Sequence, residues 1–238
     1  MNLKDVKGII FDLDGTLIKS KINFLEMKEK IIEYLNNLGL QPQLEAAKTS
    51  TLDLIEFINN RVKDKKLVKK ILENVNKIMN EIELNSLTYI ESINGVKEAL
   101  EFLKSKEIKI GVLTRGCRDY ALKSLKKTGL KNLIDYLVAR DDVNEPKPNP
   151  TSALTLAKKM NLAPNEILMV GDHILDFLCA KKAGMKFIGV LTGFSSEKEF
   201  KKIGCTFIKS VNELPLFFKW LLDFIIKAFD FCLVSFIE

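Results

Sequence analysis

The sequence predicts an α/β fold, a doubly wound parallel sheet with an inserted all-helical segment. Three observations predict it. Near the N-terminus, Ile9, Ile10 and Phe11 form a short apolar run of the kind shown by a strand that is buried on both faces. From about residue 89 onward, strand-like and helix-like segments alternate, which is typical of a parallel sheet covered by helices. Between these two regions, the apolar residues recur only at helical spacing.

Two carboxylates, Asp12 and Asp14, follow the first predicted strand directly. Acids this close together at the end of a buried strand repel each other and resist desolvation, so something must compensate them. A divalent cation held by oxygen ligands is the natural candidate, and an acidic turn without an ion is the alternative. A calcium-binding EF-hand loop is excluded, because its sixth and twelfth positions would hold Leu17 and Asn23 instead of glycine and glutamate.

An all-helical insert is predicted at residues 19–87, where no strand pattern is found. Gly39 ends the first of its helices. The discontinuous α/β core is then formed by residues 1–18 and 88–238. The helices predicted in the insert span residues 22–38, 51–62 and 67–84.

In the core, strands and helices follow one another in turn. Strands are predicted at 108–113, within 133–139, at 166–170 and at 187–191. Helices are predicted at 96–103, 119–127, 151–160 and 174–183. Because a helix separates consecutive strands, the strands are expected to run parallel in a Rossmann-like sheet with helices on both faces.

Polar residues interrupt the chain where these strands end. In open sheets of this type, ligands bind beyond the carboxyl ends of the strands, so we expect these side chains to converge. One cation, one hydroxyl and four carboxylates suit a magnesium ion and a bound phosphoryl group, with the cation offsetting negative charge. The residues are Asp12, Asp14, Thr114, Lys147, Asp172 and Asp176.

Four short motifs carry these residues in order along the chain, and together they resemble the phosphatase branch of the haloacid dehalogenase superfamily. The resemblance covers the core, roughly residues 5–18 and 88–210, and the helical insert is similar to the C1 cap of that family. The motifs are FDLDGT at 11–16, VLT at 112–114, Lys147 within KPNP, and GDHILD at 171–176.

The resemblance implies catalytic roles for four residues. Asp12 would be the nucleophile that forms an aspartyl-phosphate intermediate. Asp14 would be the general acid that protonates the leaving oxygen and then the base that activates water. Thr114 and Lys147 would bind the phosphoryl oxygens.

The resemblance also implies a Mg²⁺ site. The ion would be held by a carboxylate oxygen of Asp12, the backbone carbonyl of Asp14, and Asp172. Asp176 would support the site, either by a water-mediated contact with the metal or by a hydrogen bond to Lys147.

Two residues beside the motifs have open interpretations. Arg115 stands where the family more often has asparagine. It would bind a phosphate or carboxylate of the substrate, or else lie at the surface or pair with Asp141 or Asp142. His173 is the only histidine, and we expect it to cap a helix or lie in a loop, because Asp14 already serves as the acid.

The function predicted from the resemblance is a magnesium-dependent phosphatase of a small phosphorylated metabolite, similar to phosphoglycolate or a sugar phosphate. Asp14 disfavours dehalogenation, which has no leaving oxygen to protonate, and Thr16 favours a phosphatase over a phosphomutase. A phosphomutase of the β-phosphoglucomutase type and a phosphonate hydrolase stay as alternatives. A non-catalytic binding protein is disfavoured, because the motif residues are intact.

Composition narrows the partners and the location. The formal net charge is +6, but the lysines are spread among acids with few aromatics between them, so no nucleic acid is expected. No signal peptide is recognised at the N-terminus. Four scattered cysteines without a CxxC pair are typical of reduced thiols in a cytoplasmic protein.

Residues 223–238 form an apolar C-terminal extension with helical spacing. It is not a transmembrane segment, because its longest uncharged run is far short of the ~18 residues that a span needs. A helix with so wide an apolar surface needs cover. We expect it to pack on the core or to join two copies as a homodimer, rather than to lie on a membrane surface.

Overall fold

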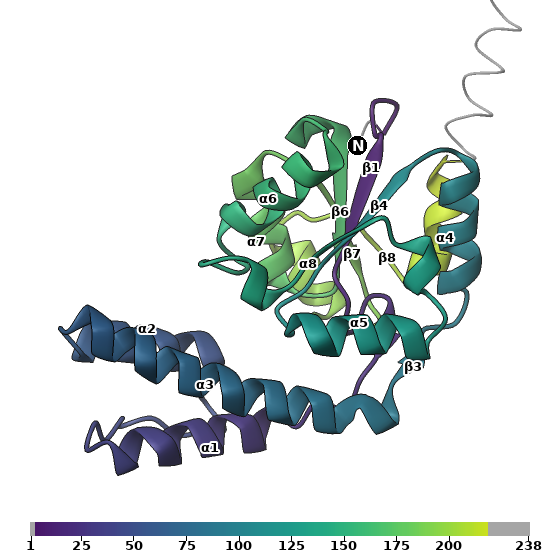
Figure 1. Ribbon diagram of the computed structural model, residues 1–238. Coiled ribbons are helices and arrows are strands. Elements are labelled where there is room, and N and C mark those ends of the chain that lie inside the picture. The colour runs from purple at the N-terminus through teal and green to yellow at the C-terminus, as the bar shows by residue number, and fades with distance from the viewer. Residues whose placement is uncertain (1–2, 219–238) are drawn as a thin grey trace, which may run out of the picture. The chain divides into compact units, whose positions relative to one another are not determined.

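The structure, a computed structural model, describes residues 3–218. The apolar extension predicted at 223–238, and with it the expected homodimer contact, lies outside the described residues. The described chain forms two compact units (Figure 1). One combines the residues up to 19 with those from 90 onward, and the other consists of residues 20–89.

A six-stranded sheet forms the centre of the first unit, and all its neighbouring strands are parallel. From β1 the chain builds outward to one side through β4 and β5, then to the other side through β6, β7 and β8. The doubly wound parallel sheet is thereby confirmed, with its reversal of direction beside β1. Across the sheet the strands are β5 (Tyr136–Val138), β4 (Lys109–Leu113), β1 (Gly8–Phe11), β6 (Ile167–Gly171), β7 (Lys186–Val190) and β8 (Phe207–Ile208).

Helices cover both faces of this sheet. Figure 1 shows α6 (Pro150–Met160) and α7 (Ile174–Ala183) on one face and α4 (Val96–Ser105) on the other. The unit also contains α5 (Arg118–Lys127) and α8 (Glu197–Lys202). Because β1 and β6 are buried on both faces, their sequences are continuous apolar runs instead of alternating ones.

Several short elements were not predicted from the sequence. β2 (Ile18–Lys19) and β3 (Glu91–Ser92) form a two-stranded antiparallel ribbon, and each strand has only two residues. So short a strand shows no alternation, so periodicity gives no signal for it. The 3₁₀ helices are η1 (Ser86–Tyr89), η2 (Lys131–Leu133), η3 (Arg140–Asp142), η4 (Pro164–Glu166) and η5 (Val211–Glu213).

The second unit consists of three helices, α1 (Phe24–Asn37), α2 (Thr51–Arg61) and α3 (Lys65–Asn85), around a core of their own. As predicted, Gly39 ends α1. Its φ of +73° lies in the left-handed region, and the Leu40 N–H donates to the Leu35 carbonyl in a Schellman motif. The buried core residues are Met27, Ile31, Leu35, Leu54, Ile58, Ile71, Val75, Met79 and Ile82.

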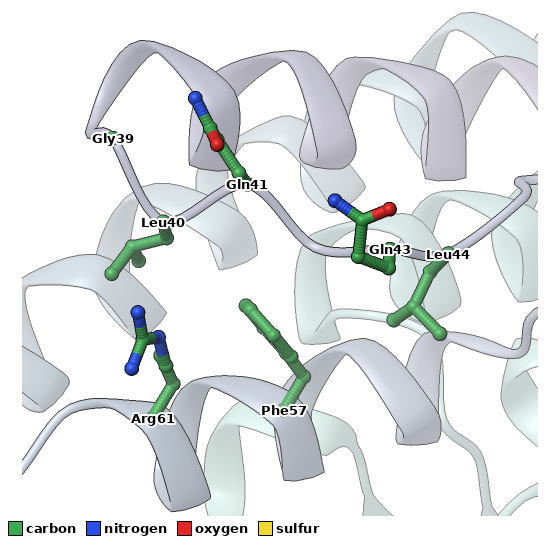
Figure 2. Close-up of a pocket in the computed structure, with 7 residues that line it drawn as sticks. All are labelled: Gly39, Leu40, Gln41, Gln43, Leu44, Phe57 and Arg61. Carbon is green, nitrogen blue, oxygen red and sulfur yellow. The ribbon is translucent and has the colours of Figure 1, made fainter.

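A pocket of about 430 Å³ lies within this helical unit (Figure 2). It lies between the chain that follows α1 and the C-terminal part of α2. Its only charged group is Arg61, and it contains none of the residues predicted to carry chemistry. The lining residues are Gly39, Leu40, Gln41, Gln43, Leu44, Phe57 and Arg61.

Within residues 3–218, none of the helices has both the length and the hydrophobicity of a membrane span. Three of the four cysteines, Cys117, Cys179 and Cys205, fall in the same described part of the chain. They are buried and not in disulfides, as expected of reduced thiols.

Candidate active site

The register of the three central strands places their ends at one edge of the sheet. Phe11, the last residue of β1, lies beside Val112 of β4 and Val170 of β6. The residues that follow these strands are Asp12, Thr114 and Asp172. They therefore emerge together at the carboxyl edge, next to the reversal of strand order where ligands bind in such sheets.

Three carboxylates meet at this edge. Ligand oxygens of Asp12, Asp172 and Asp176 all lie within 4.8 Å of one another, and the three residues are buried. Lys147, only 2% exposed, donates from Nζ to Oδ1 of Asp12 and, at 2.7 Å, to Oδ1 of Asp176. If all three acids are ionised, this one lysine leaves two negative charges uncompensated within the cluster.

The pKa values follow from this imbalance. Burial raises the pKa of Asp12 well above its usual range; Lys147 opposes the rise, and Asp176 and Asp172 add to it. Burial and the Asp176 carboxylate raise the pKa of Asp172 to about 6. Burial alone would lower the pKa of Lys147, but Asp12 and Asp176 outweigh it and raise that pKa. The lysine is therefore charged, and the cluster still attracts positive charge.

This donor set fits a hard divalent cation such as Mg²⁺. The three candidate ligands are all carboxylate oxygens, the ligand type that Mg²⁺ prefers, and the uncompensated negative charge gives the ion a reason to bind. The Asp14 side chain is not one of the three. Its predicted contribution to the metal site is a backbone carbonyl, which stays a prediction.

The position of the Asp172 carboxylate is fixed by two hydrogen bonds and by backbone segments that lie close to it. Oδ1 accepts from the Thr16 hydroxyl at 3.2 Å, and Oδ2 accepts from the Phe194 N–H at 2.7 Å. A Cβ added at Gly193 would come within 1.9 Å of Oδ2, and one at Gly15 within 2.6 Å. Only glycine at these two positions leaves room for the carboxylate, and Gly15 also has a φ of +79°.

Asp176 is held by the start of α7. Its Oδ2 accepts from the His173 N–H at 3.0 Å, while its Oδ1 accepts from Lys147. His173 Nδ1 accepts from the Leu175 N–H at 3.0 Å, which completes a capping box. The expected N-cap role of His173 is thereby confirmed, and its ring lies 4.6 Å from that of Phe194. Burial lowers the pKa of this imidazole, so it is neutral near pH 7.

Asp14 and Thr114 are placed by α5 and the loop before it. The Tyr120 hydroxyl donates to Asp14 Oδ1 at 2.5 Å. Thr114 is buried, and its Oγ1 accepts from the Gly116 N–H at 2.9 Å. The turn after β4 therefore fixes this hydroxyl, and the first turn of α5 contacts the predicted general acid.

Arg115 is partly buried beside Thr114, and its carbonyl accepts from Arg140 Nη1 at 2.8 Å. Asp142 binds Arg118 through two hydrogen bonds, Nε to Oδ1 at 2.7 Å and Nη2 to Oδ2 at 2.5 Å. The Arg118 N–H donates to Asp141. Both acids named as alternative partners of Arg115 thus contact Arg118, which ties the start of α5 to the loop after β5.

Sequence reasoning missed three contributors to this site: Tyr120, Gly193 and the Phe194 backbone. Tyr120 falls inside a correctly predicted helix, but nothing in a helical pattern says that its hydroxyl reaches Asp14. The contacts of Gly193 and Phe194 depend on a loop that returns to Asp172 after another strand. Thr16 was singled out, but not for its hydrogen bond to Asp172.

Comparisons with known proteins agree with this geometry. Residues 9–190 match the family model described as haloacid dehalogenase-like hydrolase. The chain belongs to this family. The residues that carried the resemblance at 12, 14, 114, 147, 172 and 176 all fall within the matched range.

Individual relatives place this haloacid dehalogenase-like hydrolase in the phosphatase branch and indicate a phosphoric monoester hydrolase. It is 27% identical over 217 residues to Pyrophosphatase PpaX of Bacillus pumilus, covering 90% of this chain and 97% of that protein. It is 30% identical over 193 residues to Phosphoglycolate phosphatase of Aquifex aeolicus, covering 79% and 86%. The crystal structure of CbbY from Rhodobacter sphaeroides in complex with phosphate matches with a TM-score of 0.62 at 20% identity, covering 88% and 96%. This last likeness shows the shared fold.

Magnesium is expected to stabilise the protein more at about pH 8 than at about pH 5. The folded pKa of Asp172 is about 6, above the unfolded value of about 3.9. Without metal, the folded state therefore binds more protons between these values, and stability falls as the pH rises through about 6. A bound cation compensates the charge above that pH and competes with protons below it.

Thermal melts with and without millimolar magnesium chloride measure this effect. We expect the melting temperature to rise by about 5 °C at the higher pH and by much less at the lower one. Sodium chloride at equal ionic strength controls for screening. A rise of the same size at both pH values would contradict the charge argument.

Gly193→Ala is expected to remove most of the magnesium effect, because the new Cβ would displace the Asp172 carboxylate. The control is Gly184→Ala, at the left-handed C-cap of α7, where a Cβ meets nothing within 4 Å. Both substitutions should reduce stability, Gly193→Ala by crowding and Gly184→Ala because its φ is +75°. Only Gly193→Ala should lose the magnesium-dependent rise in melting temperature. If magnesium raised the melting temperature of Gly193→Ala as much as that of the wild type, magnesium binding would not depend on the present position of the Asp172 carboxylate.

Proposed function

We propose that this protein is a magnesium-dependent phosphatase that hydrolyses a small phosphorylated metabolite through an aspartyl-phosphate intermediate. The observation that supports it most is the buried cluster at the carboxyl edge of the sheet. There, Lys147 is shared by Asp12 and Asp176. Carboxylate oxygens of Asp12 and Asp172 lie within 4.8 Å of each other, close enough to bind the same ion. An acidic turn without an ion does not explain why the chain buries three carboxylates around one cation.

Asp12 is the nucleophile in this proposal. It follows β1, the central strand at the reversal of strand order, so a phosphate ester bound at the carboxyl edge lies next to it. Lys147 binds Oδ1 of Asp12, which fixes the carboxylate and favours its ionised form. A fixed carboxylate needs little reorganisation to reach phosphorus.

The reaction has two steps. In the first, an Asp12 oxygen bonds to phosphorus, the ester P–O bond breaks, and Asp14 gives its proton to the leaving oxygen. In the second, the oxygen of a water molecule bonds to phosphorus while Asp14 takes a proton from that water, the bond between Asp12 and phosphorus breaks, and inorganic phosphate leaves. Asp12 is then again a carboxylate and Asp14 is again protonated.

Thr114, Arg115 and Lys147 would bind the phosphoryl oxygens during both steps. Their hydroxyl and cationic groups suit the charge that spreads over these oxygens in phosphoryl transfer. A magnesium ion held by Asp12, Asp172 and the Asp14 carbonyl, with Asp176 in support, would supply further positive charge there.

The substrate class is a small metabolite of the phosphoglycolate or sugar-phosphate kind. We infer that the helical unit of residues 20–89 acts as the cap that selects it, because this unit is inserted directly after the first motif and has its own core. The relatives described above include a phosphoglycolate phosphatase and a pyrophosphatase. Phosphoglycolate, sugar phosphates and pyrophosphate therefore belong in the first assays.

Asp12→Asn is expected to abolish phosphate release, because the amide cannot form the covalent intermediate. The loss of kcat should be about 10³-fold or more, and the wild-type rate should need magnesium. The measurement is inorganic phosphate released from a panel of phosphorylated metabolites with and without magnesium. Asp5→Asn, at an exposed acid outside the site, is the matched control and should keep the wild-type rate. Phosphate release unaffected by Asp12→Asn would refute the nucleophile assignment.

The same panel separates the two alternative reactions. A phosphomutase would interconvert two sugar phosphates and release little phosphate, which phosphorus NMR distinguishes directly. A phosphonate hydrolase would release phosphate from a phosphonate and spare the esters. Hydrolysis of an ester to free phosphate, with no isomer formed, is the result that this proposal expects.

A further inference from the structure

Tyr120 is the largest of the fully buried side chains within residues 3–218, and it has a polar end. A buried tyrosine hydroxyl normally finds a partner, because leaving it unpaired is unfavourable. Here the hydroxyl donates to Oδ1 of Asp14 at 2.5 Å, between residues that are 106 positions apart in the chain. The hydrogen bond therefore joins α5 to the turn that follows β1.

The surroundings of Tyr120 hold its ring in place. A Cβ at Gly116 would come within 2.9 Å of the ring atom Cδ1, so the turn after Thr114 packs on the ring only because residue 116 is glycine. The Ser124 hydroxyl donates to the Tyr120 carbonyl at 2.7 Å, within the buried side of α5. The helix begins at Arg118, which Asp142 anchors. The tyrosine hydroxyl is therefore a fixed donor.

Asp14, in contrast, is only partly buried and follows a strand in the turn that leads to Gly15. A carboxyl group in such a turn has rotamers to choose from, whereas a general acid must present one oxygen to the leaving group. A fixed donor on Oδ1 selects among these rotamers.

We propose that Tyr120 is a positioning residue for Asp14, whose hydroxyl holds the carboxyl group by Oδ1 in the orientation from which Asp14 gives and takes the proton. This inference rests on the proposed function, because it assumes that Asp14 is the general acid and base. Tyr120 thereby contributes to both steps without touching the substrate.

The test compares wild type with Tyr120→Phe on two substrates that differ in their leaving group. The phenylalanine keeps the ring and removes only the hydroxyl. For an alkyl phosphate, whose leaving alkoxide needs a proton, kcat/KM should fall about tenfold, part of the 10²–10⁴-fold that a general acid contributes. For para-nitrophenyl phosphate, whose leaving group departs as a stable anion, kcat/KM should change by less than about twofold.

A second readout reports the base role. For the nitrophenyl ester, kcat/KM includes only the steps up to departure of the leaving group, whereas kcat also includes hydrolysis of the intermediate. If Tyr120 also positions Asp14 for the second step, the variant should release a burst of nitrophenol equal to the enzyme concentration and then turn over slowly.

Two controls separate positioning from a structural role. Tyr136→Phe removes the hydroxyl of a partly buried tyrosine two residues before the end of β5 and should leave both substrates unaffected. In an Asp14→Asn background, adding Tyr120→Phe should change kcat/KM for the alkyl phosphate by less than about twofold, because Tyr120 acts through Asp14. Thermal melts of each variant confirm that it is folded.

Several results would overturn the inference. They are an equal fall of kcat/KM on both substrates, no fall on either, or an undiminished fall in the Asp14→Asn background. With an active wild type and an inactive Asp12→Asn variant, these results refute the role of Tyr120 alone. A wild type that hydrolyses no phosphate ester refutes the proposed function, and the role of Tyr120 falls with it.

Discussion

The structure of the site depends on one imbalance of charge. Three buried carboxylates lie together with a single buried lysine, which pairs with Asp12 and Asp176, so the cluster is negative wherever its acids are ionised. Burying such groups is unfavourable unless hydrogen bonds and a counter-charge compensate them. The cluster therefore attracts positive charge. Burial and the neighbouring Asp176 carboxylate accordingly raise the pKa of Asp172 to about 6.

The fold satisfies this constraint with backbone as much as with side chains. Parallel strands bring Asp12 and Asp172 to one edge, and glycines at 15 and 193 let the chain approach the Asp172 carboxylate closely. The start of α7 holds Asp176 through a capping box, so the same contacts that begin the helix also aim a carboxylate at Lys147. The hydrogen bonds that cap α7 therefore also fix the position of Asp176 in the site.

Sequence alone predicted what depends on local pattern. Asp12, Thr114 and Asp172 were found because each directly follows an apolar strand, and the carboxyl ends of parallel strands share an edge. Tyr120 and Gly193 were not found, because their roles arise from approach between distant segments and leave no periodic signal. The same reason explains the missed ribbon of β2 and β3, whose strands are too short to alternate.

That ribbon has a consequence for how proteins of this kind diversify. It pairs Lys19, directly before the helical unit of residues 20–89, with Glu91, shortly after it. The chain therefore leaves the sheet domain and returns to it through adjacent strands. Paired strands lie about 4.8 Å apart, so an inserted segment needs only neighbouring ends to fit between them. The helical unit between β2 and β3 can therefore be exchanged or enlarged in evolution without disturbing β1 and β6, the strands that precede Asp12 and Asp172. The sheet and the helical unit are then free to change independently of each other.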